Sequence, residues 1–258
     1  MWIKEVALFI GKNLWAAFFG VSLLIIISLS SFWPADFWLT RYDAIFLSAV
    51  GIQILLVTTK MESWQEVKII AVFHVAGTVM ELIKTNPQIG SWSYPEVNSA
   101  IFSVATVPLF TGFLYASVGS YIARSIRIFD VQFSYFPKKI FLGILAIAIY
   151  INFFSHHFFY DIRYILLTII LILFWKTRII FTVCEKKRNI SFLLANFFLA
   201  SAIWIAENIG SFAQVWMYPN QEIAWELVSY QKIESWFLLL FLSFFLVSLV
   251  HVNAKCKN

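Results

Sequence analysis

Charged residues are scarce in this chain of 258 residues, and their scarcity excludes an ordinary soluble domain. Asp, Glu, Lys and Arg together make up 13% of the sequence, whereas hydrophobic residues make up 61%. Soluble domains contain about 25% charged and about 45–50% apolar residues. Apolar runs of about 20 residues, the length that a membrane-spanning helix needs, recur along the chain. The composition therefore predicts an all-α, multi-pass membrane protein that forms a single integral membrane domain over residues 1–258.

Cysteines are also few, and motifs for metal binding or nucleophilic catalysis are missing. Cys184 and Cys256 form no paired framework, and both fall on the side that we assign to the cytoplasm, so we expect free thiols. The sequence contains no H-E-x-x-H and no G-x-S-x-G motif. We therefore expect neither a bound metal ion nor another cofactor.

Histidines are too scattered to form one site. The predicted topology puts His156 and His157 in one outer loop, His251 at the inner end of the last helix and His74 inside the third, so the four cannot all meet. One metal hypothesis stays open, in which His74 joins Glu81 and either His156 or His157.

The net charge of +5 does not indicate nucleic-acid binding, because the basic residues cluster in a few loops between apolar runs. Residues 1–12 are mildly amphipathic and are expected to lie at the membrane interface. We predict eight transmembrane helices, at residues 14–29, 43–59, 67–83, 97–122, 140–155, 162–175, 190–209 and 235–252. In the fourth, Pro108 is expected to kink the helix, and residues 115–120 form a seam of small residues.

The distribution of basic residues predicts the orientation. With a cytoplasmic N-terminus, 15 of the 19 Lys and Arg residues fall on the cytoplasmic side. The four on the other side are Arg41, Lys84, Arg163 and Lys232. Because cytoplasmic loops carry an excess of Lys and Arg, this distribution predicts eight crossings and a cytoplasmic C-terminus.

The two halves of the chain, about residues 1–130 and 131–258, resemble each other. Three pairs of segments match in order: Tyr42-Asp43 with Tyr160-Asp161, Glu81 with Glu207, and Trp92-x-Tyr94-Pro95 with Trp216-x-Tyr218-Pro219. Four spans in each half predict a parallel internal repeat about an axis along the membrane normal.

Two acidic residues inside apolar runs are the candidate catalytic residues. Glu81 and Glu207 lie near the outward ends of their predicted helices. A carboxylate in hydrocarbon costs several kcal/mol, so it persists where it faces a cavity or a partner, and there it can donate a proton. His74 falls two turns before Glu81 on roughly the same face, where it could relay that proton. Gly77 would let another helix approach closely. The alternative is that these polar groups only bridge neighbouring helices.

Each acid is followed by aromatic residues that are candidates for a substrate pocket. Trp92 and Tyr94 follow Glu81, and Trp216 and Tyr218 follow Glu207. Aromatic faces can stabilise a developing cation. The neighbouring amide of Asn208 could line the same cavity. The alternative is that these rings belong to the interfacial belt of a membrane protein.

The stretch from His74 to Glu96 carries a resemblance to a known family. The matching elements are His74, Gly77, Met80-Glu81, Lys84, Gly90-Ser91-Trp92-x-Tyr94-Pro95-Glu96 and Gly119-Ser120-Tyr121-Ile122-Ala123-Arg124. They resemble the signature of the YoaT-like family of uncharacterised bacterial integral membrane proteins, over most of the chain. The resemblance implies a multi-pass protein of the bacterial inner membrane, with no established activity.

A looser similarity bears on chemistry. Glu81-x(8)-Gly90-x-Trp92-x-Tyr94 is similar to the E-x-x-x-G-x-Y-x-Y pattern of carotenoid hydratases and membrane lycopene cyclases, although Asn86-Pro87 interrupts it here. Those enzymes protonate a polyene from an intramembrane acid. The similarity implies that Glu81 is the proton donor.

Three hypotheses of function follow. The first is an intramembrane enzyme that performs acid-catalysed chemistry on an isoprenoid or another membrane lipid. The second is a small-molecule or proton-coupled transporter, because repeated halves are what alternating access uses. The third is a non-catalytic membrane module. The sequence indicates neither the substrate nor the oligomeric state.

Overall fold

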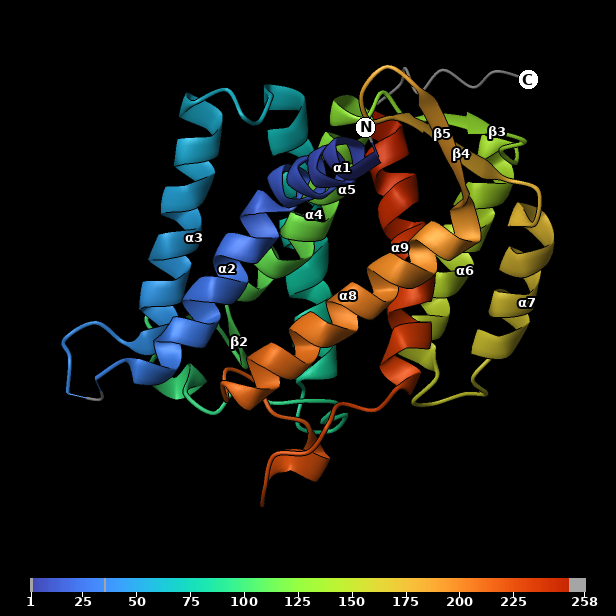
Figure 1. Ribbon diagram of the computed structural model, residues 1–258. Helices are drawn as coiled ribbons and strands as arrows, with labels where there is room; N and C mark the ends of the chain where they lie inside the picture. The colour runs from blue at the N-terminus through green and yellow to red at the C-terminus, as the bar shows by residue number, and fades with distance from the viewer. Residues whose placement is uncertain (1, 35, 251–258) are drawn as a thin grey trace. The chain divides into compact units, whose positions relative to one another are not determined.

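A computed structural model describes residues 2–34 and 36–250, which are mostly helical (Figure 1). Within them the α-helices are α1 (Trp2–Ala16), α2 (Phe18–Leu29), α3 (Arg41–Thr58), α4 (Trp64–Lys84), α5 (Phe110–Ile128), α6 (Lys139–Ser155), α7 (Arg163–Phe174), α8 (Phe192–Phe212) and α9 (Gln231–Val250). Each predicted apolar segment overlaps one of the helices α2 to α9, so the prediction of a mostly helical chain is confirmed. The predictions for His251, Lys255, Cys256 and Lys257 lie outside the described residues.

Several helices have the length and composition of membrane spans. Among the described residues, three qualify by themselves, namely Arg41–Thr58, Phe192–Phe212 and Gln231–Ser248. The broken pair α1 and α2 qualifies as a fourth if it is counted as one span, and α6 and α7 are apolar but shorter. These helices are typical of a membrane-associated chain.

The chain divides into two compact units that are interleaved in sequence. The first comprises Met1–Ala16, Tyr121–Trp204 and Tyr230–Asn258, and the second comprises Ala17–Ser120 and Ile205–Ser229. Each unit therefore takes residues from both halves of the predicted repeat. All the candidate site residues fall in the second unit.

Two helices of the second unit, α3 and α4, begin at side-chain caps. Thr40 accepts a hydrogen bond from the Asp43 backbone N–H at the start of α3. At the start of α4, Ser63 and Glu66 form a capping box in which each side chain bonds the other's backbone N–H. The capping box fixes the start of the 21-residue helix α4, and Glu81 lies in its last turn.

Helices α2 and α3 pack side by side in the second unit (Figure 1). Phe19 and Leu23 of α2 form a buried cluster with Ala49 and Leu56 of α3. The ring of Phe113 on α5 packs against this cluster. Burial of these apolar side chains stabilises the packing of α2 against α3.

The first unit contains a small sheet beside its helices, so the all-α prediction is incomplete. Strands β3 (Gln132–Ser134), β4 (Arg178–Thr182) and β5 (Lys187–Ser191) form an antiparallel sheet in the order β3-β4-β5. The predicted helices at residues 162–175 and 190–209 leave a basic loop between them, and β4 and most of β5 lie there. The run Arg178–Thr182 contains β-branched and aromatic residues, which favour a strand.

Phenylalanine rings form the core of the first unit. Phe174 of α7 stacks on Phe192 of α8 with ring centroids 5.1 Å apart, and it meets Phe241 of α9 at 5.0 Å. Phe133 of β3 adds an edge contact to Phe192 at 6.1 Å. The sheet and three helices therefore share one aromatic core.

The helix predicted at residues 97–122 begins only at Phe110. The stretch before it forms the 3-10 helix η2 (Val97–Ser99) and the strand pair β1 (Ser103–Val104) and β2 (Val107–Pro108). Asp43 accepts hydrogen bonds from the backbone N–H groups of Ile101 and Phe102, at 3.0 and 2.8 Å. The Asp43 carboxylate thus satisfies two backbone N–H groups that a helix would otherwise pair within the segment. The prediction that Pro108 kinks a helix is wrong, since it lies in β2 before the helix.

Gly112 of α5 is a position where the fold leaves no room for a side chain. A Cβ atom there would lie 2.5 Å from Nδ1 of His74, whereas one at Gly51 of α3 would meet no atom within 4 Å. We expect Gly112→Ala to destabilise the protein by about 1–3 kcal/mol through overpacking. Gly51→Ala should stabilise it by about 0.5–1 kcal/mol, because alanine favours the helix. Melting temperatures in one detergent test the pair, and a stabilised Gly112→Ala protein would contradict the packing described here.

Candidate functional site

The chain after α4 folds back over the end of that helix. Helix α4 ends at Lys84, and the N–H of Thr85 donates to the carbonyl of Glu81 at 2.8 Å. Gly90 has a φ of +56°, a conformation that glycine adopts at no steric cost. The N–H of Ser91 then donates to the carbonyl of Lys84 at 2.9 Å. This turn returns residues 92–94 to the last turn of α4.

Glu81 is held by three aromatic hydrogen-bond donors. The indole N–H of Trp92 donates to Glu81 Oε2 at 2.7 Å, and the hydroxyl of Tyr94 donates to the same oxygen at 2.9 Å. The hydroxyl of Tyr115 on α5 donates to Oε1 at 2.8 Å. The Glu81 side chain is nearly inaccessible, with 3% of the residue exposed. Burying a carboxyl group costs free energy, which its hydrogen bonds offset. The three donors also fix the orientation of the Glu81 carboxyl group.

Gly77 makes the Tyr115 contact sterically feasible. A Cβ atom at Gly77 would lie 2.6 Å from Cδ2 of Tyr115, so the phenol ring crosses α4 at the glycine. The expectation that Gly77 permits a close approach of another helix is confirmed. Tyr115 itself is not among the predicted site residues, because residues 115–120 were expected to form a seam of small residues. The sequence feature that could have identified Tyr115 is a tyrosine between Gly112 and Gly119 in an apolar run.

Glu207 of α8 has a similar environment. The indole N–H of Trp216 donates to Glu207 Oε2 at 3.2 Å, and the hydroxyl of Tyr218 donates to the same oxygen. The Trp216 ring lies directly against Gly210, where a Cβ atom would overlap it. Glu207 is partly buried, while both aromatic residues are buried. The same pair of donor types therefore holds both acids.

The two aromatic segments are hydrogen-bonded to each other. Ser93 and Met217 form an antiparallel bridge, with N–H to carbonyl distances of 2.9 and 3.0 Å. The rings of Trp92 and Tyr218 lie 6.3 Å apart at an angle of 68°. Extended backbone alternates its side chains, so both Trp–Tyr pairs are buried. We call the resulting group the acid–aromatic cluster; it comprises Glu81, Trp92, Tyr94, Tyr115, Glu207, Trp216 and Tyr218.

Two phenols of this cluster remain protonated donors. Tyr94 and Tyr218 lie in the loops that follow α4 and α8. Burial is the main cause that raises the pKa of each phenol well above its ordinary value, and the Glu81 and Glu207 carboxylates raise both values further. Both carboxylates act on both phenols, so the two acids share one electrostatic environment.

The start of α3 anchors both aromatic segments. The hydroxyl of Tyr42 donates to the carbonyl of Val215 at 2.7 Å. Arg41 forms an ion pair with Glu96 at 3.0 Å and donates to the carbonyl of Ala213. Two residues of one helix therefore hold the segment after α4 and the segment after α8 together.

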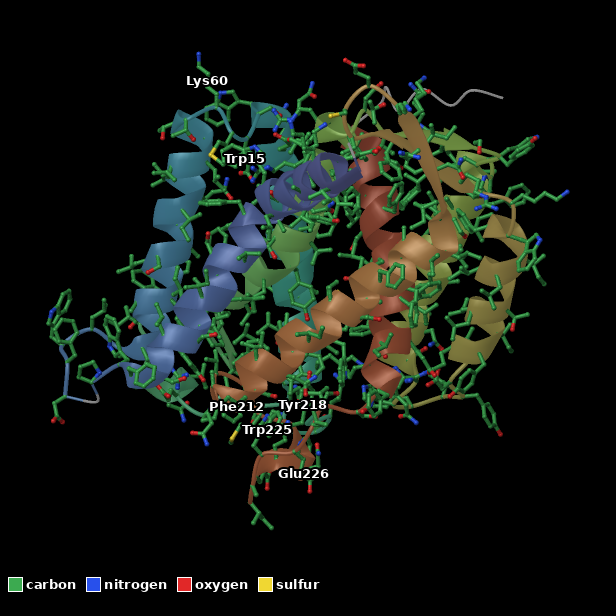
Figure 2. All side chains as sticks on the ribbon, in the orientation of Figure 1. Trp15, Lys60, Phe212, Tyr218, Trp225 and Glu226 are labelled. Atoms are coloured by element: carbon green, nitrogen blue, oxygen red, sulfur yellow. The ribbon has the colours of Figure 1, made fainter. Side chains whose placement is uncertain are left out.

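Aromatic contacts also fix the chain beyond Tyr218. Figure 2 shows Phe212, Tyr218 and Trp225 gathered at the C-terminal end of α8. The rings of Phe212 and Trp225 meet at 5.2 Å, and the Trp225 indole donates to the Ser211 hydroxyl at 3.2 Å. These contacts hold the segment that includes η3 (Pro219–Gln221) against the end of the helix.

Two other predicted site residues lie outside the cluster. The His74 ring contacts Phe113 at 4.6 Å, and its buried Nδ1 atom has no hydrogen-bond partner among the described residues. No described hydrogen bond joins His74 to Glu81, so a direct relay between them is not formed. Asn208 accepts a hydrogen bond from the N–H of Val228 at 3.0 Å, which gives it a role in holding that loop.

Lys84 is a buried basic residue of α4 near Glu81 in sequence. It lies one turn after Glu81 and is only 2% exposed. The predicted topology places Lys84 among the four basic residues on the non-cytoplasmic side. The sequence feature that could have indicated its burial is a lysine at the end of an apolar run, one turn after Glu81.

The described residues offer no metal centre. No group of three or more His, Cys, Asp or Glu side chains among them could hold a metal ion. The hypothesis of a site made by His74, Glu81 and His156 or His157 is therefore not supported. Cys184 is a free, exposed thiol.

Comparisons with known proteins identify the family. Residues 5–244 match the family described as "Protein of unknown function (DUF817)". The chain is 38% identical over 251 residues to the uncharacterized protein YoaT of Bacillus subtilis (strain 168). The matched region covers 95% of this chain and 91% of YoaT. No solved structure gives a significant match. The chain therefore belongs to the DUF817 family of proteins of unknown function.

Proposed function

We propose that this protein is a multi-pass membrane enzyme that performs acid-catalysed chemistry on an isoprenoid or another unsaturated lipid at the acid–aromatic cluster. The observation that carries the proposal is Glu81, a buried carboxyl group held by Trp92, Tyr94 and Tyr115. The second carboxyl group, of Glu207, acts on the same phenols.

The membrane part of the proposal is that α2 to α9 cross the bilayer as two parallel repeats of four, with the N- and C-termini in the cytoplasm. Large apolar side chains face outward on these helices, including Ile25, Ile54, Ile144, Ile172 and Phe198. Exposed apolar side chains of this kind favour contact with lipid. The predicted orientation puts the acid–aromatic cluster at the outer side of the membrane.

The proposed chemistry is proton transfer to a carbon–carbon double bond. The carboxylic acid of Glu81 gives its proton to one carbon, which leaves a carbocation at the other carbon and a carboxylate on Glu81. The three aromatic donors stabilise that carboxylate. The faces of Trp92 and Tyr218 are suited to stabilise the cation. Loss of a proton from the cation to Glu81, or addition of water followed by that loss, restores the acid.

The test compares Glu81→Gln with Glu96→Gln. Glutamine preserves the shape of Glu81 but has no acidic proton, whereas Glu96 pairs with Arg41 outside the cluster. Each variant is expressed in a bacterium that lacks its own family member, and extracted lipids are compared by mass spectrometry. We expect wild type and Glu96→Gln to change the lipid profile and Glu81→Gln to lose the change by about 100-fold or more. Equal profiles from wild type, Glu81→Gln and an empty vector would reject the enzyme.

A transporter is the second candidate, because two carboxyl groups from different helices, each bonded by a tyrosine hydroxyl, belong to one cluster whose aromatic segments are bridged at Ser93 and Met217. Such a group could carry a proton during transport. The transporter hypothesis predicts that wild-type proteoliposomes dissipate a pH gradient and that Glu81→Gln proteoliposomes do not. Lipid profiles would then be unchanged. A non-catalytic module would show neither effect.

A further inference from the structure

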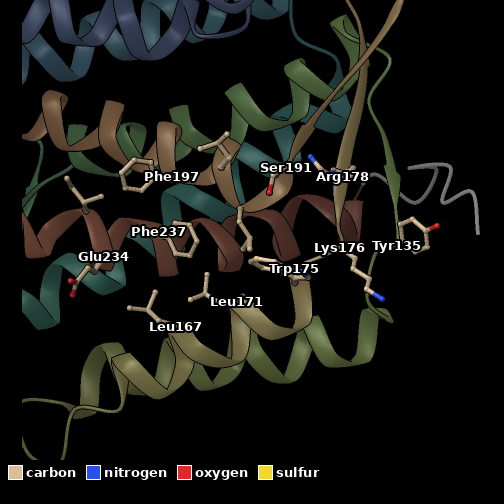
Figure 3. A pocket seen from close by; sticks show the side chains of 13 residues that line it. Tyr135, Leu167, Leu171, Trp175, Lys176, Arg178, Ser191, Phe197, Glu234 and Phe237 are labelled. Carbon is tan, nitrogen blue, oxygen red and sulfur yellow. The ribbon is translucent and has the colours of Figure 1, made fainter.

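The first unit contains a groove that lies apart from the acid–aromatic cluster in sequence and in its residues. It has a volume of about 980 Å³ and runs between α7, α8 and α9 (Figure 3). Leu167 and Leu171 of α7 form one wall, and Phe197 of α8 and Phe237 of α9 form the other. Its middle is therefore apolar.

One end of the groove is basic. Lys176 and Arg178 lie there, beside the rings of Trp175 and Tyr135 (Figure 3). Both cations are exposed, and no ion pair within the described residues engages either of them. The hydroxyl of Thr177 donates to the carbonyl of Tyr135 at 2.9 Å, which fixes the segment after β3 beside the start of β4. The basic end is therefore held by the sheet.

Glu234 lines the groove at the end away from Lys176 and Arg178 (Figure 3). Its Oε2 atom is buried and has no hydrogen-bond partner among the described residues. A carboxyl group there disfavours an anion at that end. The two ends of the groove therefore differ in charge, and the anionic group of a ligand is favoured at Lys176 and Arg178.

The shape selects an amphiphile over a small ion. Small-molecule sites have volumes of about 300–1,000 Å³, so this groove is at the large end of that range. A free phosphate would meet the two cations and leave the apolar walls uncovered. Trp and Tyr beside Lys and Arg are also the residues that line the headgroup region of a bilayer.

We propose that this groove binds an anionic phospholipid. The headgroup phosphate contacts Lys176 and Arg178, and the acyl chains lie along Leu167, Leu171 and Phe237. The proposal rests on the membrane placement given above, but it does not depend on the chemistry at Glu81.

The experiment measures binding of dioleoylphosphatidylglycerol and dioleoylphosphatidylcholine to the full chain in detergent, by native mass spectrometry. We expect the wild type to prefer the anionic lipid. Lys176→Gln with Arg178→Gln should weaken its binding roughly 30-fold, since each basic residue near a membrane surface contributes about 1 kcal/mol. The matched control is Lys186→Gln with Lys187→Gln, which removes equal charge from exposed positions that do not line the groove.

A second pair of variants tests the apolar walls. Leu171→Trp places a larger ring in the groove and should weaken phosphatidylglycerol binding about tenfold. Ile172→Trp, on the next residue of α7 and outside the groove, should not. Equal losses in both charge variants, or full binding by Leu171→Trp, would overturn the proposal. So would equal affinity of the wild type for the two lipids. Lipid profiles that still depend on Glu81 would then leave the proposed enzyme standing.

Discussion

Replacing Glu81 with alanine is expected to lower the free energy of unfolding by about 3–6 kcal/mol. The substitution removes the acceptor of the hydrogen bonds from Trp92, Tyr94 and Tyr115. Trp92 and Tyr94 are buried, and water does not readily replace the lost acceptor. Each buried donor without a partner costs about 1–3 kcal/mol. Thermal unfolding of the purified protein in detergent measures the loss.

Two variants separate this structural effect from catalysis. Glu81→Gln keeps one acceptor oxygen at the same place, so we expect it to lose less stability than Glu81→Ala. Glu207→Ala removes the acceptor for Trp216 and Tyr218, but Glu207 is only partly buried, and we expect a loss of about 1–3 kcal/mol. A Glu81→Ala protein as stable as the wild type would show that the three donors find other acceptors. The burial argument for the cluster would then fail.

The composition of the acid–aromatic cluster could be predicted in large part from the sequence. An acid in an apolar run must have partners, and a Trp-x-Tyr-Pro segment after each acid supplied the donors. Tyr115 could not be found in this way. It comes from a different helix, and its hydroxyl reaches Glu81 only because α5 crosses α4 at Gly77. Contacts between helices far apart in sequence leave no spacing pattern in one chain.

The errors in the fold have a similar cause. Residues 97–109 are apolar enough to continue a helix, but Asp43 of α3 binds their backbone and holds them out of one. The basic stretch around β4 forms a strand because β3 and β5 supply its hydrogen bonds. Tertiary partners override the local preference for a helix in the first case and complete a locally favoured strand in the second. His74 lies two turns before Glu81 in α4, as its spacing predicts, and its ring lies against Gly112 and Phe113 of α5.

Arg41→Ala is expected to lower the free energy of unfolding by about 2–4 kcal/mol, although Arg41 lies at the surface end of its helix. The side chain is 11% exposed and bonds the carboxylate of Glu96, the carbonyl of Ala213 and the hydroxyl of Ser30. Those groups come from three segments that are distant in sequence. Its loss leaves a buried carbonyl without its donor, at about 1–3 kcal/mol, and adds the smaller loss of a half-exposed ion pair.

Arg163→Ala is the matched control for this prediction. Arg163 also begins a helix and also pairs with a carboxylate, that of Asp161 at 2.7 Å. Asp161 is its near neighbour in the chain, so this pair joins no distant segments, and we expect a loss below about 1 kcal/mol. Arg41→Lys should recover part of the stability, since lysine keeps the charge but lacks the planar fork. Hydrogen exchange should then rise at residues 213–218 in Arg41→Ala and stay unchanged in Arg163→Ala. Equal stability losses in the two alanine variants would mean that Arg41 acts through local charge alone, and that the start of α3 does not hold the two aromatic segments together.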